Sequence, residues 1–140
     1  MMSELFVTDT PEPGQRNALL SLLQSYNLQH AGPAMVMPLA ILLRGEAGEV
    51  IGGLHATSAY EWLIVELVFV PEELRHGGVG SALLAKAEEV ARARGCAGIW
   101  LDTFSFQARG FYEQLGYEVF GEVPGHPAGG ARYFLKKALT

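Results

Sequence analysis

The spacing of apolar side chains alternates along the chain between a helical period and short continuous runs. Apolar residues recur at helical intervals over 15–27, which predicts an amphipathic helix there. Residues 39–44, 50–60 and 61–70 are apolar, and the last run is rich in β-branched and aromatic side chains. Because only short turns separate these runs, we expect three strands in an antiparallel meander. A short strand is also expected over 5–8.

The second half of the chain returns to the helical period. Apolar residues from Val79 to Ala91 fall on one helical face, Glu88 and Arg92 stand in the order that favours an ion pair, and Gly95 is a typical helix stop. A strand, a helix and two strands follow, over 99–103, 105–115, 117–123 and 132–135. The order β-α-β-β-β-α-β-α-β-β predicts an α/β fold: one domain over 1–140, with a central mixed sheet flanked by helices.

Composition narrows the possible functions. The 140 residues carry a net charge of −5, so the chain lacks the basic surface of a nucleic-acid-binding protein. Its one cysteine excludes an intrachain disulfide, and no two of its four histidines share a metal-ligand spacing, so no metal is expected. We find no apolar run long enough to span a membrane and no signal-peptide pattern over 1–15, which predicts a cytoplasmic protein.

A glycine-rich turn, Arg75-His76-Gly77-Gly78-Val79-Gly80-Ser81, joins the third strand of the meander to the next helix. A helix start has unpaired N–H groups and a positive dipole end, and glycines let a phosphate approach that backbone. The turn therefore predicts a phosphate site, although a merely flexible connection would also use these residues. A P-loop requires Lys before the Ser, where this chain has Gly80, and a dinucleotide fingerprint requires a third glycine where it has Leu83.

Two motifs together resemble the GNAT family of N-acetyltransferases. Arg75-x-x-Gly78-x-Gly80 resembles the family's acetyl-CoA motif, and residues 111–117 (FYEQLGY) are similar to its second signature, FYEKLGF. The resemblance covers essentially the whole chain. It implies an acetyl-CoA-dependent acyltransferase in which the amides of residues 75–81 hold the CoA pyrophosphate.

The same resemblance assigns further cofactor contacts. Val68, Phe69 and Val70 match a strand that is split by a bulge and pairs with the pantetheine arm. Phe111 is assigned to the core and to the cofactor side of the site. Two positions depart from the family pattern: His76 stands where Gly is common, and Ser105 stands where an Asn contacts the cofactor.

Two residues are candidates for the chemistry of acyl transfer to an amine. Glu66 lies in an apolar strand close to where a thioester would sit, and it is the candidate base, acting directly or through a water. An ion pair or a place at the sheet edge would equally explain this glutamate. Tyr112 is the candidate acid for the leaving thiolate, and its alternative is a core aromatic residue.

The acceptor is expected to be a small-molecule or peptide amine. Asp102 and Gln107 are candidate substrate residues, because ligands gather beyond strand ends in such sheets. His55, within the strand over 50–60, is a candidate for lining the acceptor pocket, and a packed histidine is its alternative. A homodimer is possible, with the C-terminal strand as a candidate edge for pairing. A non-catalytic acyl-CoA-binding sensor of the same fold remains an alternative.

Overall fold

The computed structural model describes residues 3–140. The chain divides into two compact units, with the boundary between Ala34 and Met35. The first unit contains helix α1 (Pro13–Ala31), which starts two residues earlier than predicted because proline is well suited to a first helical turn. The Gln15 side chain accepts a hydrogen bond from Glu12 N at 2.8 Å, which caps this helix. The strand expected over 5–8 is wrong: within residues 3–140 no strand pairs with this segment, and Leu5 is 99% exposed.

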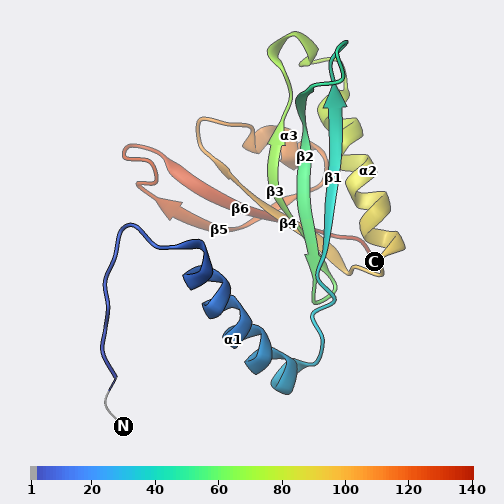
Figure 1. The fold of residues 1–140 in the computed structure, drawn as a ribbon. Coiled ribbons are helices and arrows are strands. Elements are labelled where there is room, and N and C mark those ends of the chain that lie inside the picture. Colours follow the sequence, from blue (N-terminus) through green and yellow to red (C-terminus); the bar gives the residue numbers. More distant parts are fainter. Residues whose placement is uncertain (1–2) are drawn as a thin grey trace. The chain divides into compact units, whose positions relative to one another are not determined.

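The second unit is built on a six-stranded sheet with the order β1-β2-β3-β4-β6-β5 (Figure 1). Its strands are β1 (Met37–Arg44), β2 (Val50–Ala59), β3 (Trp62–Phe69), β4 (Gly98–Phe104), β5 (Glu118–Pro124) and β6 (Ala131–Ala138). The first three strands form the predicted antiparallel meander, and only β3 and β4 pair in parallel. The mixed sheet and the α/β class are therefore confirmed, while the single domain over 1–140 stays a prediction.

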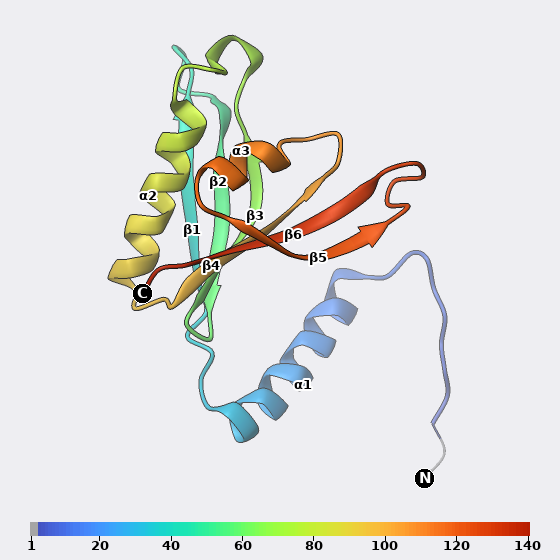
Figure 2. The same cartoon turned by 180° about the vertical axis from the view of Figure 1, so that it is seen from behind.

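The helices of this unit lie against one face of the sheet, in front of it in Figure 2. They are α2 (Val79–Ala93) and α3 (Arg109–Gln114), and the 3-10 turn η1 (Glu72–Leu74) belongs to the connection from β3 to α2. The core forms between α2 and alternate strand residues, and its largest fully buried side chains are Leu54, Leu63, Leu84, Ile99, Leu101 and Leu135. Because one strand face is buried here, the neighbouring strand residues point to the opposite face.

The helix expected over 105–115 begins only at Arg109, so its first turn is replaced by a loop. The Ser105 amide donates a hydrogen bond to Ala131 O of β6, and the Ser105 hydroxyl accepts one from Ala131 N. The Gln107 side chain accepts a hydrogen bond from Phe104 N. Such local hydrogen bonds compete with helix formation, which explains the late start.

The C-terminal strand does not offer a free edge. β6 lies between β4 and β5 and pairs with both, because β5 folds back along its outer side. The prediction that this strand pairs across a dimer is therefore wrong, and the edges of the sheet are β1 and β5. In the described residues, no helix combines the length and hydropathy that a bilayer crossing needs.

Candidate functional site

The parallel pair at the centre of the sheet separates halfway along its length. β3 pairs with β4 only from Trp62 to Val65, opposite Gly98 to Leu101. Beyond that point β3 continues to Phe69 alongside β2, and β4 continues to Phe104 alongside β6. The β3 backbone from Glu66 to Phe69 therefore has no strand partner on the β4 side, which leaves an opening between the two strands.

A register shift accompanies this separation. His55 of β2 pairs with Leu67 while Ala56 pairs with Val65, so Glu66 is the extra residue of a β-bulge. The bulge lies just ahead of Val68 and Phe69, which the family resemblance assigned to the split strand. Both residues still pair with β2 on their other side.

The bulge places Glu66 on the sheet face away from α2. Val65 is buried on the α2 side, whereas Glu66 and Leu67 are both exposed. The Thr57 hydroxyl donates a hydrogen bond of 2.5 Å to Glu66 Oε1, and His55 lies exposed on the same face. Glu66 is thus an open carboxylate with one fixed partner, rather than half of an ion pair within residues 3–140. Thr57 was missed by sequence reasoning, although strand alternation places it on this face.

The glycine-rich turn forms an uncapped helix start. The first helical hydrogen bond of α2 runs from Ala82 N to Gly78 O at 3.0 Å, and Gly78 takes a left-handed φ of 86°. In the described part of the chain, the backbone amides of residues 76–81 meet no acceptor. The Arg75 amide was assigned to the same phosphate site, and that part of the prediction is wrong, because this amide donates to Glu72 O at 3.2 Å. Consecutive free amides at the positive end of a helix dipole form an anion site.

His76 makes the first bend of this turn with a side chain present. Its φ is 64°, a left-handed conformation that glycine adopts at lower cost. The departure from the family pattern noted at this position is therefore a local strain, while the side chain itself is exposed.

The Arg75 side chain folds back onto the end of β3. Its Nε donates to Val70 O at 2.9 Å, and its guanidinium carbon lies 5.8 Å from the centre of the Phe69 ring. Arg75 therefore holds together the two segments assigned to the cofactor, the end of the strand and the start of the turn.

Helix α3 packs beside the glycine turn. A Cβ added at Gly80 would lie 3.0 Å from the Phe111 ring, so this glycine makes room for Phe111 as well as exposing backbone. Phe111 is half-buried and meets the Tyr112 ring edge-on at 5.1 Å. Phe111 thus lies between the core and the turn, and its assignment to the cofactor stays a prediction.

Tyr112 has a buried ring, only 7% exposed, and a hydroxyl with no hydrogen-bond partner among residues 3–140. Burial and then the charge of Asp102 raise the pKa of Tyr112 above its ordinary value. Its phenol therefore stays protonated at neutral pH and has a proton to donate.

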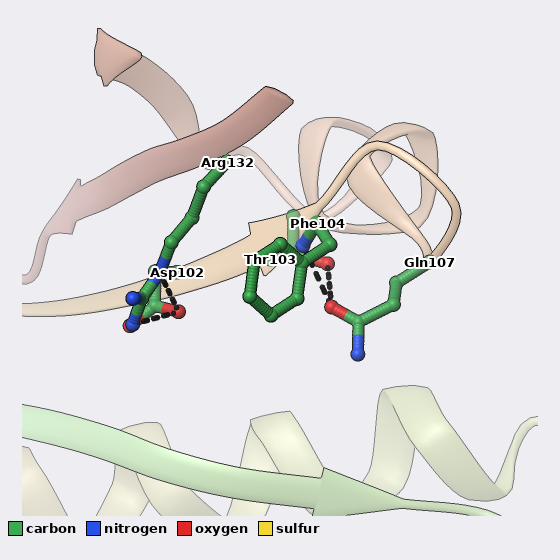
Figure 3. Close-up of polar contacts among 5 residues, drawn as sticks. All are labelled: Asp102, Thr103, Phe104, Gln107 and Arg132. Atoms are coloured by element: carbon green, nitrogen blue, oxygen red, sulfur yellow. Dashed lines mark hydrogen bonds and ion pairs between the residues drawn. The ribbon is translucent and has the colours of Figure 1, made fainter. Parts of the chain in front are cut away.

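Asp102 is engaged by an arginine that sequence reasoning missed. Arg132 Nη2 lies 2.8 Å and its Nε 2.9 Å from Asp102 Oδ1, an ion pair between β4 and β6 (Figure 3). The guanidinium also lies near the Phe104 and Phe134 rings, at 5.4 and 5.3 Å. Strand alternation gives the face of Arg132, but only the β4–β6 register shows its partner.

A buried polar cluster lies behind the site, on the α2 side of the sheet. Glu88 accepts hydrogen bonds from Tyr117 Oη at 3.0 Å and from Lys137 Nζ at 2.9 Å, and Lys137 also donates to Leu115 O at 2.8 Å. The expected pairing of Glu88 with Arg92 is wrong, because Glu88 shares the buried face of α2 with Leu84. No group of three potential metal ligands gathers anywhere in the described residues.

Comparison with known proteins decides which family this geometry represents. The family model described as "Acetyltransferase (GNAT) family" matches residues 1–117. The chain belongs to the GNAT acetyltransferase family. The resemblance drawn from the two motifs and the prediction of an acyltransferase are both confirmed.

GNAT relatives cover nearly the whole chain. Acetyltransferase Atu2258 of Agrobacterium fabrum is 36% identical over 131 residues, 94% of this chain and 96% of that protein. The Blasticidin-S acetyltransferase of Streptomyces morookaense is 37% identical over 126 residues, 89% of this chain and 91% of that protein. A crystal structure of an acetyltransferase from Bacillus cereus is 29% identical with a TM-score of 0.83, covering 95% of this chain and 97% of that one.

Proposed function

We propose that this GNAT protein transfers an acetyl group from acetyl-CoA to a primary amine of a small molecule or peptide. The observation that carries the proposal is the run of free amides over residues 76–81 at the start of α2. A diphosphate is a natural ligand for such a site, since it offers several anionic oxygens to adjacent N–H donors.

The position of the turn gives the co-substrate a direction. The unpaired β3 backbone leads back from Arg75 through Val70 and Phe69 to Glu66, alongside the opening toward β4. An amide-bearing arm can pair with such an edge as an added strand would. The reactive thioester is thereby directed from the glycine turn toward the bulge, where Glu66 lies.

Acyl transfer requires a neutral amine, a stabilised oxyanion and a leaving thiolate. At pH 7 an amine of pKa ~10.4 is neutral in about one molecule in 2,500, a cost of about 4.6 kcal/mol. Glu66 is the proposed base, because its carboxylate is open to the acceptor side and oriented by Thr57. The Glu66 carboxylate accepts a proton from the attacking nitrogen as the amide bond forms.

Tyr112 is the proposed acid for the leaving sulfur. Its hydroxyl has no partner within residues 3–140, and its raised pKa keeps the proton in place. A neutral phenol is a weak donor, so its contribution is a hydrogen bond or a proton to sulfur as the C–S bond breaks.

A small cationic amine is the acceptor class to test first. The Streptomyces relative is named for blasticidin S, a small-molecule acceptor. In this chain the exposed Glu66 carboxylate faces the side from which an acceptor would approach, and it favours a cation. His55 beside it and Asp102 across the opening remain proposed acceptor contacts.

The test is thiol release from acetyl-CoA over a panel of small and peptide amines, with mass spectrometry of the product. Cys96 adds little background, because its thiol is buried and burial raises its pKa. Glu66→Gln keeps an oxygen for Thr57 and should lower kcat/KM roughly 100-fold if Glu66 is the base. Tight CoA binding without turnover on any amine would contradict the proposal and favour a sensor.

A further inference from the structure

The carboxamide of Gln107 is held in one orientation by two hydrogen bonds. Gln107 Oε1 accepts from Phe104 N at 2.7 Å and from the Thr103 hydroxyl at 3.1 Å. Since both partners donate to the same atom, they define which end of the amide is oxygen and which is nitrogen. The side chain is therefore preorganised although it stands in an exposed loop.

The nitrogen end of this amide has no partner. Within residues 3–140, no hydrogen bond from Gln107 Nε2 exists, and the residue is exposed. Figure 3 shows the nitrogen pointing away from β4, on the side of the picture where β3 lies. A fixed donor is thus directed toward the opening that follows the separation of β3 from β4.

Ser105 has a different task in the same loop. Its hydroxyl accepts a hydrogen bond from Ala131 N at 3.1 Å, and its own amide donates to Ala131 O at 2.8 Å. A Cβ added at Gly130 would lie only 2.5 Å from the Ser105 hydroxyl oxygen, so the glycine makes room for this hydroxyl. Ser105 therefore fastens the loop to β6, and Gln107 carries the loop's free side-chain donor.

We propose that Gln107 Nε2 donates a hydrogen bond to an amide carbonyl of the pantetheine arm of acyl-CoA. The inference rests on the proposed function, since it places that arm in the opening beside β3. A neutral N–H donor with no acceptor suits a carbonyl oxygen better than a phosphate, and the free amides of residues 76–81 already serve the phosphates. Gln107 is then a cofactor-binding residue, and Ser105 is not.

The decisive variant is Gln107→Glu. Its carboxylate keeps an acceptor for Phe104 N and the Thr103 hydroxyl but replaces the donating nitrogen with oxygen. We expect the acetyl-CoA KM and the CoA Kd to rise about tenfold, with kcat and melting temperature nearly unchanged. Binding of adenosine diphosphate, which lacks the pantetheine arm, should stay the same.

Two matched variants separate this from a purely structural role. Thr103→Val removes one of the bonds that orient the amide, and Ser105→Ala loosens the loop, but both keep the Gln107 nitrogen. We expect each to change the CoA Kd less than twofold, whatever its effect on stability. Should Gln107→Glu fold poorly, Gln107→Met supports the same comparison of CoA with adenosine diphosphate.

Unchanged CoA affinity in Gln107→Glu would overturn the inference, as would an equal loss of affinity for CoA and adenosine diphosphate. A CoA Kd that rises equally in Thr103→Val would also overturn it, because the loop geometry would then be the cause. Wild-type protein that binds neither CoA nor its diphosphate fragment would instead refute the proposed function.

Discussion

The glycines at the two ends of α2 allow a matched test of the anion site. Gly78 has a φ of +86° and Gly95 a φ of +78°, and a Cβ added at either would meet no atom within 4 Å. An L-residue in this conformation costs about 1–2 kcal/mol. At about 2.1 cal/mol/K per residue over 140 residues, the entropy of unfolding is near 0.29 kcal/mol/K. Gly78→Ala and Gly95→Ala should each lower Tm by about 3–7 °C.

The two substitutions should differ in cofactor binding. A methyl group at Gly78 stands beside the free amides of residues 79–81, whereas one at Gly95 stands at the far end of the helix. Keeping the phosphate from one charge-assisted hydrogen bond of about 1.5–3 kcal/mol weakens binding roughly 10- to 150-fold. Calorimetric titration with CoA measures this directly, with Gly95→Ala as the control for backbone strain. A CoA Kd for Gly78→Ala within twofold of that for Gly95→Ala would refute the assignment of the turn.

Three further predictions concern the residues behind the turn. Tyr112→Phe removes only a hydroxyl and should lower kcat roughly 100-fold with little change in KM; equal steady-state rates would remove Tyr112 from the mechanism. The pKa values of Tyr112 and Tyr117 are both raised in the fold, by burial first, so the folded state holds these protons more tightly. The contribution of these two tyrosines to the free energy of unfolding should therefore be fully present below pH ~10 and be lost as the pH rises above it. Urea unfolding at several pH values measures this change. Lys137→Met leaves the Glu88 carboxylate buried without its cation and should cost about 3 kcal/mol, whereas adding Glu88→Gln should recover part of that loss in a double-mutant cycle.

Periodicity and motifs predicted most elements of the second unit. The meander, α2 and the glycine turn follow from local patterns, because one strand face and one helix stripe must be buried. The strand predicted over 5–8 is absent from residues 3–140; a short apolar run does not show whether a neighbouring strand is available to pair with it. The helix over 105–115 was predicted too long because side-chain hydrogen bonds of Ser105 and Gln107 override helical spacing.

The site was partly readable in the same way. The turn and Tyr112 were located by motif, and Glu66 by its charge in an apolar strand. The bulge at Glu66, by contrast, depends on the β2–β3 register, and the basic residues that pair with Asp102 and Glu88 come from β6. Contacts between residues far apart in sequence require the topology, which local pattern does not contain.

The separation of β3 from β4 has a consequence for the ligand-free molecule. Because β3 and β4 stop pairing after Val65 and Leu101, unpaired strand edges lie in the interior of the sheet, where most sheets have none. Unpaired edges can pair with other extended chains. A bound acyl-CoA that completes this ladder would act as a folding ligand as well as a substrate. At 100 times its Kd it would add about 2.7 kcal/mol to the stability of the native state. The concentration of the donor would then set the stability of the native state as well as the rate of the reaction.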